Sequence, residues 1–97
     1  MNALNNLKQS VQLSQNNAFV IFSPVNITYI SGFNGHAATI LIMADKCYFI
    51  TDYRYFEQAK SQAKGFEVIC RDRTKQSLGQ LLNQILEQHS IQKLYFE

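Results

Sequence analysis

The chain of 97 residues is poor in the residue types on which several common classes of site depend. It has two histidines, two cysteines and one proline, and 16% of its residues are charged. Cys47 and Cys70 are far apart and lack the spacing of metal ligands, so the sequence predicts neither a zinc site nor a disulfide framework. We expect both cysteines to be reduced and buried in strands.

Long apolar runs are absent as well. No stretch approaches the ~20 residues that are needed to cross a bilayer. Residues 1–15 lack the apolar segment of a secretory signal. The sequence therefore predicts a cytoplasmic protein with no membrane partner.

The charge balance argues against binding to nucleic acid. The formal net charge is +2, which is too small to indicate a phosphate-binding surface. Arg71, Arg73 and Lys75 form the only cationic run, and Asp72 interrupts it. This run is typical of a solvated face.

Familiar catalytic motifs are also missing. There is no G-x-S-x-G sequence, and neither cysteine has a histidine near it in the chain. The segment from Gly32 to Gly35 lacks the Lys-Ser/Thr pair of a phosphate-binding loop. No two carboxylates have a spacing that requires a metal or an acid–base pair.

What the sequence does contain is a series of short apolar runs separated by polar segments. These runs predict strands over residues 18–22, 37–43, 47–50, 66–70 and 91–96. The first run, AFVIF, is apolar at every position and is typical of a strand that is covered on both faces. Residues 44–46 form a hairpin loop between the second and third strands.

Three helices are expected beside these strands. Leu4, Leu7 and Val11 predict an amphipathic helix over residues 3–15. A second helix is predicted to begin near Thr51 or Asp52, with Phe56, Ala59 and Ala63 buried and Gly65 just beyond its end. In the third, Ser77 and Gln80 form a capping box, followed by the apolar stripe Leu78, Leu81, Leu82, Ile85 and Leu86.

The connection after the first strand is the least regular part of the chain. Ser23-Pro24 stops the strand because proline cannot donate to a ladder. Residues 26–30 fit either one helical turn, with Asn26 as its cap, or an extended segment. Gly32 and Gly35 permit the positive φ angles of a loop.

The element order is α-β-β-β-α-β-α-β. The hairpin is antiparallel, while the later β-α-β units favour parallel neighbours. The predicted fold class is therefore α/β, with a three-layer arrangement of a mixed five-stranded sheet and flanking helices. Because the last strand runs to Glu97, we expect the chain to come from a longer parent.

Few side chains are candidates for function. His36, between a glycine loop and a buried strand, is either a site residue or an exposed loop residue. Phe33 is predicted to be exposed in the same loop, as an interface residue or a substrate wall. Arg54 could bind a carboxylate outside the domain, or it could pair locally with Glu57. His89 is interpreted as a helix-terminal residue that the dipole stabilises.

The segments FSPVNITYISGF (residues 22–33) and ITDYRY (residues 50–55) resemble the N-terminal domain of the creatinase/prolidase family. The similarity is greatest to the bacterial Xaa-Pro dipeptidases and aminopeptidases. Its most specific elements are N-x-x-Y-x-S-G-F and T-D-x-R-Y, and it extends over residues 18–68.

This resemblance implies a ribonuclease-H-like domain in a two-domain, dimeric peptidase. The catalytic domain, a pita-bread fold downstream, would hold two divalent ions, manganese or cobalt, that activate water against the Xaa-Pro bond. None of the metal ligands would lie in this chain, which would be non-catalytic by itself. Its partners would be its own catalytic domain, a second subunit and a proline-containing peptide.

The resemblance also implies that the loop from Phe33 to His36 lies near the substrate, with His36 where the family has an arginine. The candidate cleft or interface residues are thus Phe33, Asn34, His36 and Arg54. The alternative is a stand-alone binding module or nuclease-like domain with the same fold. A metal nuclease needs a carboxylate on its first strand, and residues 19–22 have none.

Overall fold

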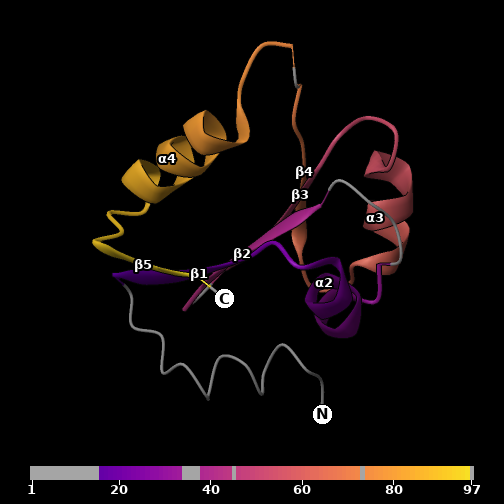
Figure 1. Ribbon diagram of the computed structural model, residues 1–97, viewed down its shortest axis with the longest axis horizontal. Helices are drawn as coiled ribbons and strands as arrows, with labels where there is room; N and C mark the ends of the chain where they lie inside the picture. Colours follow the sequence, from indigo (N-terminus) through magenta and orange to yellow (C-terminus); the bar gives the residue numbers. More distant parts are fainter. Residues whose placement is uncertain (1–15, 34–37, 45, 73, 97) are drawn as a thin grey trace.

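The computed structural model describes residues 16–33, 38–44, 46–72 and 74–96 (Figure 1). The helix predicted over residues 3–15 lies outside the described residues. The elements are β1 (Asn17–Ile21), α2 (Pro24–Ser31), β2 (Thr39–Met43), β3 (Cys47–Thr51), α3 (Phe56–Gln62), β4 (Glu67–Cys70), α4 (Leu78–Gln88) and β5 (Lys93–Phe96).

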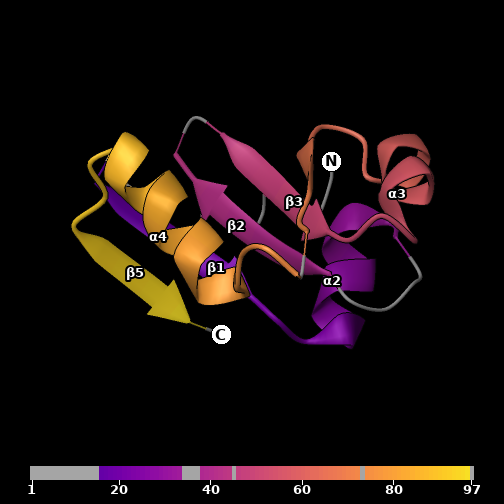
Figure 2. The same ribbon diagram turned by 90° about the horizontal axis from the view of Figure 1, so that it is seen from above.

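The strands form one five-stranded mixed sheet in the order β4-β3-β2-β1-β5. β2 is antiparallel to both of its neighbours, whereas β3 pairs with β4 and β1 pairs with β5 in parallel. The predicted α/β class with a mixed five-stranded sheet is confirmed. The prediction of parallel neighbours holds for β3 and β4 but not for β4 and β5, which lie at opposite edges because α4 crosses the sheet between them (Figure 2).

Helices cover both faces of the sheet, so the molecule has three layers (Figures 1 and 2). All five residues of β2 are buried, as are all five of β3. Because side chains alternate along a strand, Leu41 and Met43 face α4, while Ile40 and Ile42 pack on the opposite side. The core therefore has two halves, one on each side of the sheet.

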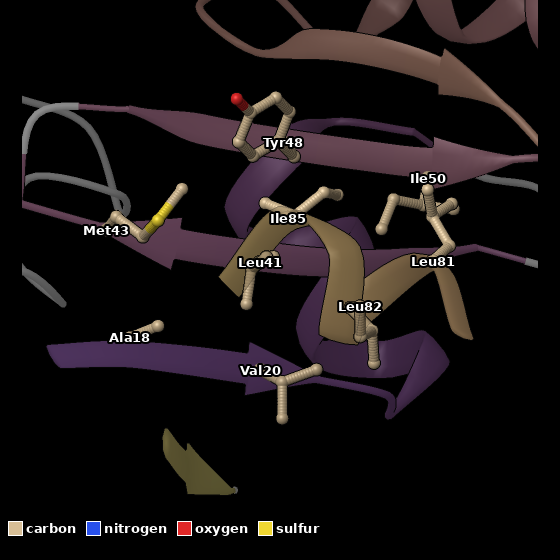
Figure 3. Packing of buried hydrophobic residues seen from close by; sticks show 9 residues of the cluster. All are labelled: Ala18, Val20, Leu41, Met43, Tyr48, Ile50, Leu81, Leu82 and Ile85. Atoms are coloured by element: carbon tan, nitrogen blue, oxygen red, sulfur yellow. The ribbon is translucent and has the colours of Figure 1, made fainter. Parts of the chain in front are cut away.

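The half beneath α4 is shown in Figure 3, where Leu81, Leu82 and Ile85 of α4 lie over Leu41 and Ile50 of the sheet. α4 begins with the capping box expected from the sequence. The backbone N–H of Gln80 donates to Oγ of Ser77 at 3.1 Å, and the backbone N–H of Ser77 donates to Oε1 of Gln80 at 2.9 Å. Two of the N–H groups at the helix start are thereby satisfied within the chain.

The segment after β1 is a full helix, α2, rather than one turn or an extended piece. Pro24 occupies its first turn, where the missing N–H costs nothing. Ser23, and not Asn26, is the N-cap residue. Gly32 ends the helix with a φ angle of 82°, and its N–H donates to the carbonyl of Thr28, which confirms the expected left-handed conformation.

Two other local expectations are wrong. α3 begins at Phe56, later than predicted, because Asp52 does not cap it and residues 53–55 form a turn. Cys70 is exposed, whereas Cys47 is buried, and both are free thiols. Cys70 is the last residue of β4, a short strand at the edge of the sheet. Cys47 lies in β3, which has a neighbouring strand on each side.

Ser77→Ala should reduce the free energy of unfolding by about 1 kcal/mol, the typical cost of losing an N-cap side chain. The matched control is Ser61→Ala on α3, because Ser61 is exposed within the helix and should change stability by less than about 0.5 kcal/mol. Urea unfolding monitored by circular dichroism measures both values. Equal effects of the two variants would contradict the role assigned to the capping box.

Candidate functional site

Polar residues gather where β3 and β4 end and β2 begins. Because β2 runs antiparallel to β3, its first residue, Thr39, lies at the same edge of the sheet as Thr51, the last residue of β3. Arg71 follows β4, and its backbone N–H donates to the carbonyl of Thr51 at 2.7 Å. This edge therefore combines hydroxyl, guanidinium and carboxylate groups from segments that are distant in sequence.

Asp52 and Arg54 form a close ion pair at this edge. Nη2 of Arg54 donates to Oδ2 of Asp52 at 2.7 Å, Nε donates to the same oxygen at 3.2 Å, and the backbone N–H of Arg54 donates to Oδ1 at 3.0 Å. The carboxylate is almost completely buried, while the guanidinium is about half exposed. The predicted pairing of Arg54 with Glu57 is wrong, since Glu57 pairs with Lys60 at 3.7 Å.

The environment of Arg54 stabilises its charge. The hydrogen bond that Arg54 donates to Asp52 and the charge of that carboxylate raise the pKa of Arg54 above its usual range. The guanidinium also lies over the ring of Tyr55, at 5.3 Å from the ring centroid. Arg54 is therefore held in place by its neighbours while part of it stays at the surface, beside the exposed ring of Tyr53.

Two adjoining cavities open at this edge. One, of about 270 Å³, is lined by residues from β2, β3, the segment after β4 and the start of α4, namely Ala38, Thr39, Ile50, Thr51, Asp52, Arg71 and Leu78. The other, of about 340 Å³, is lined by Tyr53, Cys70, Arg71, Asp72 and Thr74. Arg71 lines both cavities.

Phe33 does not lie at the surface, and the prediction of an exposed loop residue is wrong. Its side chain is 0% exposed and packs against Phe49, with 4.9 Å between ring centroids. The reversal at Gly32 explains this placement. Hydrogen bonds then hold the returning chain, because the N–H of Phe33 donates to Oγ of Ser31 at 3.1 Å and Oγ1 of Thr28 donates to the carbonyl of Phe33 at 2.9 Å.

The two other loop candidates, Asn34 and His36, lie outside the described residues. Ala38, shortly after them in the chain, lines the 270 Å³ cavity. His89 caps the end of α4, as the sequence predicts for its position, but its partner was not foreseen. Its Nε2 lies 3.0 Å from Oη of Tyr48, which links α4 to β3.

Sequence reasoning missed Thr39 and Arg71. The sequence predicts Arg71 in a solvated cationic run, yet in the structure it is only partly exposed at the sheet edge. Its position directly after a predicted strand could have indicated this placement, because residues that follow neighbouring strands lie together at one edge of the sheet. Among the described residues, no group of three or more His, Cys, Asp or Glu side chains could hold a metal ion, and no helix is long and apolar enough to span a membrane.

Comparison with known proteins places this architecture in a known domain family. Residues 4–97 match the family model described as the Creatinase/Prolidase N-terminal domain. An uncharacterized peptidase, YqhT, of Bacillus subtilis (strain 168) is 45% identical over 78 residues. That match covers 80% of this chain but 21% of the relative.

Solved structures show the same fold. A Xaa-Pro dipeptidase from Bacillus anthracis superposes with a TM-score of 0.84 and 28% identity, covering 97% of this chain and 26% of that protein. The N-terminal domain of the cytoplasmic peptidase PepQ from Mycobacterium tuberculosis H37Rv gives a TM-score of 0.74 and 31% identity, covering 97% of this chain and 68% of that domain. The chain thus spans about a quarter of the length of the full-length dipeptidase.

Phe33→Ala should destabilise the fold by about 3–5 kcal/mol, because it removes a fully buried ring from the core. Tyr29→Ala on α2 is the control, since the side chain of Tyr29 is 74% exposed and should change stability by less than about 0.5 kcal/mol. Chemical denaturation of the two variants tests this difference. A loss at Phe33 no larger than at Tyr29 would show that the ring is exposed after all.

Thr74→Val should raise the pKa of Asp72 towards its ordinary value of 3.8, because hydrogen bonds from the side chain and backbone of Thr74 are the main causes of its lowered pKa. Asp72 therefore stabilises the fold at pH values above 3.8, and that contribution is lost as the pH falls through its lowered pKa. NMR titration of the carboxyl carbon measures the shift. Lys75→Gln should have the smaller effect, since the charge of Lys75 is the weaker cause, and the reverse order would contradict this account.

Proposed function

The chain belongs to the creatinase/prolidase N-terminal domain family, and we propose that it acts as the non-catalytic N-terminal domain of a cytoplasmic Xaa-Pro metallopeptidase. The observation that carries this proposal is the match over residues 4–97, nearly the whole chain, to a domain that makes up about a quarter of a Xaa-Pro dipeptidase. The cytoplasmic location is supported by the relative described as a cytoplasmic peptidase.

Catalysis is assigned to a pita-bread domain of the parent protein, downstream of this one. Two divalent ions, manganese or cobalt, would activate a water molecule there for attack on the Xaa-Pro bond. The described residues of this chain do not fit such a centre, because their acidic and histidine side chains form no cluster. We assign to this domain the role that the family resemblance implies, which is to shape and close the substrate cleft.

The sheet edge with Asp52, Arg54 and Arg71 is the surface that we assign to the cleft. It presents a guanidinium that a buried carboxylate holds in place, next to an exposed aromatic ring at Tyr53. Such a combination suits contacts with a peptide or with another protein surface. Asn34 and His36, which lie outside the described residues, stay candidates for the cleft because the family resemblance implies that their loop lies near the substrate.

We further propose that the domain contributes to a homodimer of the parent enzyme. Exposed aromatic and apolar side chains support this assignment. Val25 and Tyr29 on α2 are 77% and 74% exposed, and Phe96 on the edge strand β5 is 63% exposed. Aromatic residues are enriched in protein interfaces, where they add buried area at low entropic cost.

His36→Gln in the full-length parent should raise KM for a Xaa-Pro substrate about fivefold with kcat unchanged, the effect of losing a hydrogen bond worth about 1 kcal/mol. The double variant Asp52→Asn/Arg54→Gln should do the same, and it leaves no unpaired buried charge. Steady-state kinetics measure both.

Lys60→Gln, on the exposed surface of α3, is the matched control and should leave KM and kcat unaltered. Unchanged kinetics in both test variants would refute the cleft assignment. The present chain alone, assayed with manganese and a Xaa-Pro dipeptide, should show no hydrolysis. Turnover by this chain would overturn the non-catalytic role.

A further inference from the structure

The cavity of about 270 Å³ at the sheet edge has the chemistry of a small binding site of its own. We propose that it binds a carboxylate group, with the guanidinium of Arg71 as the main contact and the hydroxyl of Thr39 as the second. The carboxylate is either the C-terminal group of a peptide or an acidic side chain from the rest of the parent protein. In either case the carboxylate would be bound through the same two contacts.

Arg71 is the first reason for this inference. Its Nη1 donates to the carbonyl of Gln76 at 3.0 Å, and its backbone N–H is bonded to the carbonyl of Thr51, so the residue is anchored at two points. No carboxylate among the described residues lies within ion-pairing distance of it. A guanidinium has five N–H donors in a planar fork that matches a carboxylate. Most of these N–H donors remain available to a ligand.

Thr39 provides an independent reason. The residue is 7% exposed and lines the cavity, on the face of β2 that also carries Leu41 and Met43. Its hydroxyl makes no hydrogen bond to another described residue. A hydroxyl in the wall of a cavity can donate a hydrogen bond to a ligand oxygen there.

The local charge favours an anion with one negative charge. Asp52 also lines the cavity, but its carboxylate is neutralised by Arg54 at 2.7 Å. Leu78, the first residue of α4, lies in the wall, so the positive end of the helix dipole is next to the site. The oxygens of Asp52 would repel a doubly charged phosphate more strongly than a singly charged carboxylate.

The apolar residues in the cavity wall also suit a carboxylate ligand. Ala38, Ile50 and Leu78 give the cavity an apolar side, so that a carboxylate on a small apolar group would have both parts accommodated. Arg54 offers a useful contrast, because its carboxylate partner is already present in the chain. Of the two arginines at this edge, Arg71 is the one whose guanidinium lacks such a partner among the described residues.

The inference goes beyond the proposed function, and only its peptide source rests on it. NMR titration of the ¹⁵N-labelled chain with sodium acetate, against sodium chloride at equal ionic strength, tests the site directly. Saturable shifts at the amides of Thr39, Arg71 and Leu78 are expected. Absence of saturation, or the same shifts with chloride, would overturn the inference and leave the peptidase assignment untouched.

Variants make the test specific to the two contacts. Arg71→Gln should weaken acetate binding about tenfold or more, as expected for a charge-assisted hydrogen bond, and Thr39→Val about fivefold. Lys75→Gln removes a nearby charge that does not line the cavity and should change affinity less than about twofold. Because Arg71→Gln also breaks the contact with Gln76, its amide spectrum must first show a folded chain. Thr39→Val, which keeps the side-chain shape, provides the test if it does not.

The dipeptide Gly-Pro and its C-terminal amide distinguish the two sources. Binding of Gly-Pro at least about tenfold tighter than acetate, with no binding of the amide, supports a peptide carboxylate as the natural ligand. Equal affinities for Gly-Pro and acetate support an acidic side chain of the parent protein. If the affinities of Arg71→Gln and Thr39→Val both match that of the unmodified chain, the site is refuted.

Discussion

The complete burial of β2 is the constraint on which the rest of the structure depends. A strand whose side chains are all apolar, except for one threonine, needs an apolar layer on each side, and a chain of this length has few segments to supply it. α2 and α3 cover one side, so α4 must cover the other. To do so it starts near β4, crosses the central strands and leaves β5 at the far edge, beside β1. The sheet order thus follows from the need to cover both faces of the central strands.

The same strand creates the polar edge. Because β2 runs against its neighbours, its first residue meets the last residues of β3, and the segment after β4 joins them through the backbone of Thr51. Thr39 and Thr51 are buried at these strand ends, but their hydroxyl groups leave no charge in the core. Asp52 is buried and charged, and Arg54 compensates it from two residues away. Charge pairing and cavity formation at this edge are therefore consequences of the strand directions.

The sequence was sufficient for features that depend on local patterns. Apolar runs located the strands to within about two residues, and Ser77 with Gln80 identified the start of α4, because periodicity and capping are properties of neighbouring residues. The sequence was not sufficient where contacts between distant residues, or unusual local contacts, determine how a side chain is placed. The glycines around Phe33 suggested an exposed loop, but hydrogen bonds of its backbone with Thr28 and Ser31 hold the chain where the ring is buried. Arg54 was matched to Glu57 by helical spacing, although its position precedes the helix. The role of Arg71 depends on which strand ends adjoin, and no local pattern contains that information.

The pairing of β1 with β5 has a consequence for how the domain is made in the cell. Asn17 lies opposite Lys93 in this parallel pair, so the strand nearest the start of the described chain pairs with the strand nearest its end. During synthesis, β1 to β4 can leave the ribosome and assemble on local contacts, but one edge of β1 stays open until β5 emerges. An open strand edge is a template for association with other chains. Until β5 is synthesised, the nascent chain therefore presents the free edge of β1, whereas the folded domain presents the shorter strand β5 at that side of the sheet.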